Sequence, residues 1–279
     1  MAREQSESAP AVVRSISLDR GPHRSFLSDI AIDYGPEKEL SRLFLAADSR
    51  MRERGIRLSF ASFDELVAVN RRNGKTWRPI LPLFDPAVSD VSERNGYALI
   101  GRNASGEVVF TYGSRAFHLG ETTLKDEIES LRVFYRDPER SKAPGEAMIV
   151  TAPAALTRRG LVAFTGAAWA RPDYRKANLV HVTTPLTRGL SHTLWGWDFL
   201  FSFMAPEVVR GGIARECRMH ADWKVEMINT PVLRGDTIHA ALVWTDWNTQ
   251  LQFIRDFLAE RSPLQEAQVD HIVNDGTAD

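Results

Sequence analysis

Residues 160–179 read Gly160-Leu-Val-Ala-Phe-Thr-Gly-Ala-Ala-Trp-Ala-Arg-Pro-Asp-Tyr-Arg-Lys-Ala-Asn-Leu179. The pattern predicts an apolar strand, a sharp turn at Arg171-Pro-Asp173, and then the start of an amphipathic helix. A strand that breaks directly into a helix leaves several backbone N–H groups unpaired at the helix start. Those donors and the positive end of the helix dipole form a natural site for a phosphate or another anion.

The elements downstream of this turn follow from hydrophobic periodicity. The helix is predicted to bury one face, and Pro185 inside it is expected to kink it or to remove one turn of hydrogen bonding. The apolar residues of that face are Leu179, Val182, Leu186, Leu190 and Leu194. The later predicted elements are a strand over 197–204, a helix from 206 to about 218, strands over 223–228 and 238–244, and a helix from an Asn248 cap to about 260.

Upstream, the clearest local signal is a hairpin, because the apolar runs 97–100 and 108–112 flank Asn103-Ala-Ser-Gly106. Thr123 and Asp126 form a capping-box pattern that opens a helix to about Leu131. The other predicted elements are a helix over 37–55, a strand over 56–60, a helix from a Ser62 cap to about 72, and strands over 148–151 and 161–169. This mixed order indicates an α+β domain on a partly antiparallel sheet.

Composition restricts the classes of function. The chain has 279 residues, is 43% apolar and carries a formal net charge of −1, which suits a globular protein and removes the electrostatic driving force for binding nucleic acid. The single Cys217 excludes an intramolecular disulfide and fits a reducing compartment. No window approaches the roughly 18 to 20 consecutive apolar residues that span a bilayer. We therefore expect a cytoplasmic protein with neither a nucleic-acid nor a membrane partner.

We expect one domain over residues 31–260, with a largely helical part at 31–90 and a sheet core at 91–260. Residues 1–30 are predicted to form a flexible N-terminal arm and residues 261–279 a flexible acidic tail. A homodimer is left open.

The stretch around Tyr174-Arg175 resembles the acetyl-coenzyme A (acetyl-CoA) loop of the GNAT superfamily of N-acetyltransferases. In that family a strand, a loop of the form Arg/Gln-x-x-Gly-x-Gly/Ala and a helix hold the cofactor pyrophosphate on backbone amides. The two small positions fall here on Asn178 and Val180. Asn can adopt the left-handed conformation that Gly adopts easily, whereas the β-branched Val180 is a poorer substitute.

The resemblance covers roughly residues 97–244 as an order of elements and implies a mixed, mostly antiparallel, twisted sheet flanked by helices. It also implies that the strand 197–204 splays from its neighbour, so that an acyl-pantetheine lies between them like an extra strand. The cofactor, acetyl-CoA or another acyl-CoA, would be bound by residues of the loop and of that strand. These residues are Arg175, Lys176, Ala177, Asn178, Leu179, Val180, Phe201 and Phe203.

The catalytic candidates are carboxylates and one thiol. Acylation of an amine needs a base for the ammonium proton, and Glu127 or Glu129 would serve if they face the cleft; the competing interpretation is a solvated acidic helix face. Many members of the family carry a Tyr on the helix after the splayed strand, but residues 206–220 contain none. Cys217 or solvent would replace it, and a merely buried cysteine is the alternative.

The remaining polar residues form no recognised metal-binding or catalytic motif. The seven His show no metal-ligand spacing, so we expect no metal site. His220 lies three residues beyond Cys217 and could form a Cys–His pair with it. Arg115 and Arg132 could hold a substrate carboxylate, or form surface ion pairs with neighbouring Glu residues.

Three hypotheses of function follow. The first is an acyl-CoA-dependent N-acyltransferase that acts on a small amine or an amino-acid-like acceptor. The second is a catalytically silent scaffold of the same fold that binds a ligand or a partner, since fold does not fix function. The third is an enzyme similar to acyl-homoserine-lactone synthases.

Overall fold

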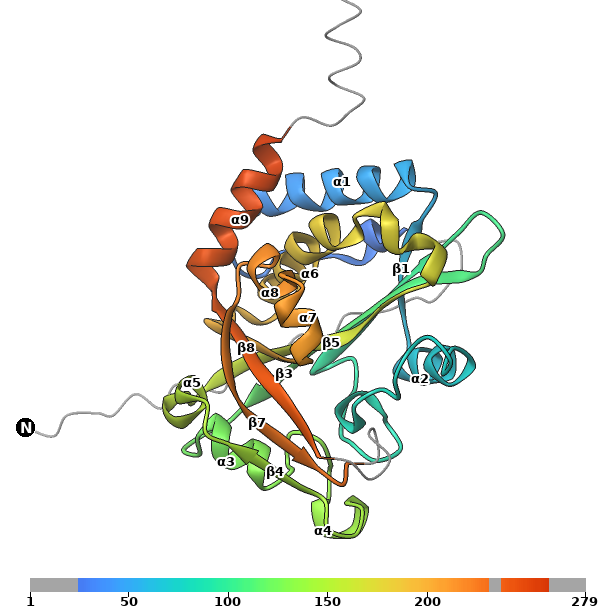
Figure 1. The fold of residues 1–279 in the computed structure, drawn as a ribbon. Coiled ribbons are helices and arrows are strands. Elements are labelled where there is room, and N and C mark those ends of the chain that lie inside the picture. The colour runs from blue at the N-terminus through green and yellow to red at the C-terminus, as the bar shows by residue number, and fades with distance from the viewer. Residues whose placement is uncertain (1–24, 231–236, 261–279) are drawn as a thin grey trace, which may run out of the picture.

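A sheet of eight strands organises residues 25–230 and 237–260, which are the parts of the chain that the computed structural model describes (Figure 1). The strand order is β1-β2-β3-β5-β6-β8-β7-β4. The strands are β1 Arg57–Ala61, β2 Gly96–Arg102, β3 Val108–His118, β4 Ala147–Val150, β5 Leu161–Ala170, β6 Phe199–Met204, β7 His220–Ile228 and β8 Ile238–Asp246. The predicted tail, and the predicted arm up to residue 24, lie outside the described residues.

Two hydrophobic cores lie on opposite faces of this sheet. Successive residues of a strand point to opposite faces, so Tyr97 and Leu99 of β2 belong to one core and Ala98 and Ile100 to the other. Helices α1 Glu37–Glu53, α6 Leu179–Trp195, α8 Ile213–Glu216 and α9 Trp247–Ala259 cover the first core (Figure 1). Helices α2 Phe63–Arg72, α3 Leu124–Glu129 and α5 Pro153–Thr157 cover the second. The short helices α4 Pro138–Ser141 and α7 Pro206–Arg210 complete the α-helices of the described parts.

The sheet is mixed and mostly antiparallel, as the sequence predicts. Among the strands of the described ranges, β5 and β6 form the one parallel pair, and every other pair is antiparallel. The long helix α6 connects these two parallel strands, because a parallel pair needs a crossover. The fold is therefore α+β, with β5, α6 and β6 in the order that the resemblance implies. The link from β5 to α6 is a 3-10 helix, Pro172–Ala177, and not the sharp turn that was expected to pass directly into the helix.

Helix α6 packs closely against α1. A Cβ atom at Gly189 would lie 2.6 Å from Cδ2 of Leu43, so a larger residue there would have to displace the Leu43 side chain. The helix passes through Pro185 as one continuous element, and most of its side chains are buried.

Several local predictions are confirmed. The side chain of Ser62 accepts a hydrogen bond from the Glu65 amide at 3.0 Å, and Thr123 and Asp126 form a complete capping box. The hairpin of β2 and β3 is present. Among the residues with described placement, no helix is both long and apolar enough to cross a membrane.

Other predicted boundaries are wrong. The helix predicted over 206–218 is divided into α7 and α8 by Gly211 and Gly212, and Gly212 adopts a φ of +90° that no helix interior accommodates. The closing helix starts earlier than predicted, because Asp246 rather than Asn248 is the cap and accepts a hydrogen bond from the Thr249 amide at 2.9 Å. Helix α3 ends at Glu129 instead of Leu131, which has a positive φ of 62°.

Candidate functional site

The parallel strands β5 and β6 diverge towards their carboxyl ends. They pair only from Val162↔Phe199 to Phe164↔Phe201. Beyond these pairs, β5 continues beside β3 to Ala170, while β6 continues beside β8 to Met204. Beyond Phe164 and Phe201, the main-chain groups of β5 and β6 that face each other therefore form no hydrogen bonds between the two strands. The gap between them can be filled by an extended ligand.

A β-bulge in β5 lies at the point of divergence. The register with β3 shifts between Thr111 and Gly113, and Ala167 has a φ of 50°. The Thr111 hydroxyl donates a hydrogen bond to the Ala167 carbonyl at 2.8 Å and holds this conformation. Since a bulge bends its strand, it accounts for the departure of β5 from β6.

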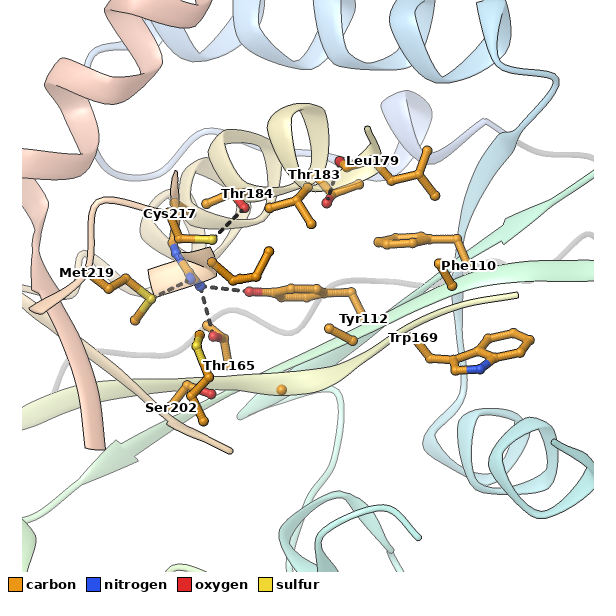
Figure 2. A pocket seen from close by; sticks show the side chains of 17 residues that line it. Phe110, Tyr112, Thr165, Trp169, Leu179, Thr183, Thr184, Ser202, Cys217 and Met219 are labelled. Atoms are coloured by element: carbon orange, nitrogen blue, oxygen red, sulfur yellow. Dashed lines mark hydrogen bonds between the residues drawn. The ribbon is translucent and has the colours of Figure 1, made fainter. Parts of the chain in front are cut away.

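A cavity of about 230 Å³ lies between the diverging strands and α6 (Figure 2). Its wall is mainly apolar, with contributions from β3, β5, α6, β6 and the end of α8. Figure 2 shows Thr183 and Thr184 in the upper part of the site, Thr165 and Ser202 in its lower part, and Tyr112 between them. The polar groups that line it are Tyr112, Thr165, Thr183, Thr184, Arg188, Ser202 and Cys217. Within the described ranges, no carboxylate lines this cavity.

The start of α6 opens onto the same cavity. Asn178, the residue before the helix, adopts the left-handed conformation with φ 49° and ψ 46°. In the part of the chain that the structure describes, no side chain caps this helix start. Leu179 and Val180, the first two residues of the helix, line the cavity. Uncapped N–H groups and the helix dipole thus meet a hollow that can receive an anion.

Three arginine and lysine side chains surround this turn. Arg175 donates to the carbonyls of Ala170 at 3.2 Å and Thr76 at 3.0 Å, which fastens the turn to the end of β5. Arg54, the residue that follows α1, donates to the Ala177 carbonyl at 2.9 Å. Lys176 is exposed. These cations give the start of α6 a positive environment and hold its backbone in place.

Phe201 and Phe203 direct their side chains away from the cavity. Both rings belong to the core on the opposite face, where the centroid of Phe201 lies 5.1 Å from that of Phe164. Because side chains alternate along a strand, Ser202 and Met204 are the β6 residues that line the cavity. Only the main chain of Phe201 and Phe203 is available to a ligand between the strands.

Glu127 and Glu129 lie on the opposite face of the sheet, on α3, and neither lines the cavity. Arg132 donates to Glu127 at 2.7 and 2.9 Å, and this hydrogen bonding lowers the pKa of the carboxyl group. Glu129 accepts hydrogen bonds from Lys125 and from the Val150 amide. The structure does not bring these carboxylates together with the start of α6.

Cys217 does line the cavity, and its side chain is buried. Its Sγ atom lies 3.3 Å from the Thr184 hydroxyl (Figure 2). Burial raises the pKa of the thiol, so the group stays protonated near neutral pH. The ring of His220 instead stacks on Trp244 with centroids 4.4 Å apart. A protonated thiol can donate a proton, whereas an activated Cys–His pair finds no support in these contacts.

Arg188 is the residue of this cavity that sequence reasoning missed. It is only 3% exposed, and its Nη1 atom donates to the hydroxyls of Tyr112 at 2.7 Å and Thr165 at 2.9 Å. A hint was present in the sequence, because Val180, Thr184 and Arg188 recur every four residues and form one stripe along α6.

No protein-family model and no curated protein sequence matches the chain. Among solved structures, the chain is similar to the dodecameric spermidine N-acetyltransferase of Vibrio cholerae, with 8% identity and a TM-score of 0.42 over 71% of this chain and 97% of that one. It is similar to NAA60 of Arabidopsis thaliana in complex with acetyl-CoA, with 9% identity and a TM-score of 0.42 over 69% and 99%. A third similar structure is an uncharacterized protein of Bacillus halodurans, with 9% identity and a TM-score of 0.38 over 73% and 90%. At such identities the likeness assigns no residue and no substrate to this chain.

Proposed function

We propose that this chain is an acyl-CoA-dependent N-acyltransferase that acts on a small amine or an amino-acid-like acceptor. One observation carries the proposal: the uncapped start of α6 and the gap between β5 and β6 open onto the same cavity. A pyrophosphate needs the first feature, and an extended amide-containing arm needs the second.

The residues at the helix start suit a phosphate in conformation and in charge. The left-handed backbone at Asn178 leaves the first amides of α6 free of side-chain caps. Val180 packs its side chain against the core around α6, and its N–H belongs to the uncapped helix start. Arg175 and Lys176 add positive charge. Together the residues from Arg175 to Val180 would hold the pyrophosphate.

The residues further inside the cavity suit the reacting end. When bound, an acyl thioester supplies an activated acyl carbon. Main-chain N–H groups of β6 around Phe201 to Phe203 would pair with the arm and polarise the acyl carbonyl. Cys217, which burial keeps protonated, would donate a proton to the departing thiolate. The acceptor nitrogen must lose its own proton before it attacks, and in this proposal solvent water takes that proton.

A catalytically silent binding protein is the second candidate, and one observation favours it. Within the described residues, no carboxylate or histidine lines the cavity, so the wall supplies no side chain for removal of the amine proton. Under this alternative the same site binds the cofactor, or a related anionic ligand, without turnover.

Isothermal titration calorimetry with CoA and acetyl-CoA tests the proposal. We expect saturable binding of both by the full chain. Absence of binding at millimolar cofactor would eliminate the proposed function. If binding occurs, release of free CoA from acetyl-CoA in the presence of a panel of amines separates the enzyme from the silent scaffold.

A further inference from the structure

Arg188 places a permanent positive charge inside an apolar cavity without a counter-charge. The side chain is 3% exposed, and its contacts in the described structure are the hydroxyls of Tyr112 and Thr165 and the sulfur of Met219 at 3.3 Å. All three partners are neutral. Its Nε–H group is buried and has no partner among the described residues.

The free energy of this arrangement is unfavourable unless something else occupies the cavity. Burial of a charge is strongly unfavourable unless the charge is paired and hydrogen-bonded. Removing Arg188 from water gains two neutral hydrogen bonds and one weak contact to sulfur. The buried charge of Arg188 therefore indicates a negatively charged ligand that pairs with the guanidinium.

The hydroxyls around Arg188 are arranged to donate to the same ligand. Tyr112 and Thr165 accept hydrogen bonds from Nη1 of Arg188. An oxygen that accepts in this way keeps its own hydrogen for another acceptor. In Figure 2 the dashed lines from these contacts end on the labelled Tyr112 and Thr165 at the edge of the cavity. The Nε–H of Arg188 and the hydroxyls of Tyr112 and Thr165 can therefore each donate a hydrogen bond to a ligand.

The position of Arg188 along α6 places these donors at the inner end of the cavity. Arg188 follows Val180 by eight residues, which is about 12 Å along a helix axis. Thr165, its partner, directly follows Phe164, the last residue of β5 that pairs with β6. A ligand that enters at the start of α6 therefore meets Arg188 with its far end.

We infer that this cavity recognises a carboxylate at the end of an otherwise apolar group, with Arg188, Tyr112 and Thr165 as its donors. The inference rests on the proposed function and deepens it. The carboxylate belongs either to the acyl group, as in a dicarboxylic acyl thioester, or to an amino-acid-like acceptor. An acetyl group would leave the charge of Arg188 unpaired.

The test compares matched ligands on wild type and on Arg188→Met, which keeps the apolar stem and removes the charge. The first arm titrates succinyl-CoA and butyryl-CoA, whose acyl groups differ chiefly in the terminal carboxylate. The second arm titrates amino acids and their carboxamides in the presence of CoA. We expect about tenfold or greater preference for the carboxylate in one arm, since charge-assisted hydrogen bonds are the strong ones. The arm that shows it identifies the source.

That preference should disappear in Arg188→Met and shrink in Tyr112→Phe, a variant that removes only one hydroxyl. Unchanged affinity for butyryl-CoA and an unchanged circular dichroism spectrum show that the variants still fold. Equal preference in wild type and Arg188→Met, or no preference in either arm, overturns the inference.

Failure of the proposed function is distinguishable. If no CoA compound binds, the thermal midpoint is measured with butyrate and hexanoate and with the corresponding amides. If the carboxylates raise the thermal midpoint of wild type but not that of Arg188→Met, the result supports the carboxylate site. The acyltransferase proposal is then rejected on its own. No stabilisation of wild type by any carboxylate overturns both.

Discussion

The Nη1 atom of Arg188 lies 2.7 Å from the hydroxyl oxygen of Tyr112, deep between α6 and the sheet. No carboxylate in the described parts of the chain pairs with this guanidinium. The contact joins the middle of the helix to β3 beneath it, at the inner end of the cavity that begins at the start of α6. One ligand would therefore contact α6 at two places, with its pyrophosphate at the start of the helix and its carboxylate at Arg188.

Arg188→Met should leave the free energy of unfolding unchanged or raise it by about 1–4 kcal/mol, because apolar side chains often replace buried charges without loss. Urea denaturation of the ligand-free protein measures this. Tyr112→Phe is the matched control, since it removes the hydroxyl and keeps the charge buried. A loss of several kcal/mol in Arg188→Met would instead assign the residue a structural role.

Reversal of charge at Arg175 should weaken binding of CoA by about tenfold or more, because a carboxylate would face the bound pyrophosphate. Arg175→Gln separates the effect of charge from loss of the hydrogen bonds to Ala170 and Thr76. Arg140→Glu on α4 is the control for net charge, since this exposed residue lies outside the cavity wall. Equal affinity in wild type and Arg175→Glu would count against the assigned pyrophosphate site.

Val180→Gly should preserve or strengthen binding of CoA. A glycine at the second position of α6 lets a phosphate approach the backbone more closely. Calorimetry at matched protein stability checks this, with Val182→Ala as a control on the buried face of the same helix. A large loss of affinity in Val180→Gly alone would show that the valine side chain, and not its amide, contacts the ligand.

Glu127→Gln should leave turnover within about twofold of wild type, because the carboxylate lies on the face of the sheet opposite α6. Its half-exposed partner Arg132 makes the ion pair worth only about 0–1 kcal/mol of stability. Steady-state kinetics with a responsive amine would measure kcat and KM. A fall in kcat by orders of magnitude, with KM unchanged, would restore Glu127 as the base.

The stability of the fold should decrease as the pH falls below neutrality, in part through His192. Burial lowers the pKa of this residue from 6.5 to about 4, and its ring stacks on Trp247 at 3.5 Å. The unfolded chain therefore binds a proton more readily than the folded one between these values. The stabilisation is complete above about pH 6.5 and is lost as the pH falls through 4.

His192→Phe measures this contribution, because a phenyl ring retains the stacking and cannot titrate. The free energy of unfolding from urea denaturation, at intervals from pH 4 to 7, should fall less steeply in the variant than in wild type. Parallel curves would show that other groups account for the acid sensitivity.

The sequence predicted the features that arise from local rules. The hairpin of β2 and β3, the caps at Ser62 and Thr123, and the left-handed backbone at Asn178 all depend on neighbours within a few residues. The left-handed backbone at Asn178 could be predicted because Asn is one of the few residues other than Gly that adopt this conformation. The mixed sheet followed from the order of these elements.

The remaining features depend on long-range packing. The orientation of Phe201 and Phe203 depends on the register of β6 against β8, which is set across the sheet and reverses with a shift of one residue. Sequence spacing does not show that α3 and α6 lie on opposite faces of the sheet. It therefore could not exclude Glu127 and Glu129 as bases at the start of α6. Arg188 was overlooked because a charged residue on a helix is usually solvated, and only the fold shows that its face is buried.

A crystal structure of the full chain with CoA tests the central claim most directly. We predict density for the pyrophosphate within hydrogen-bond distance of the amides at Asn178 to Val180, and for the pantetheine arm between β5 and β6. Saturated crystals with CoA bound elsewhere, or with the gap between these strands empty, would contradict the claim.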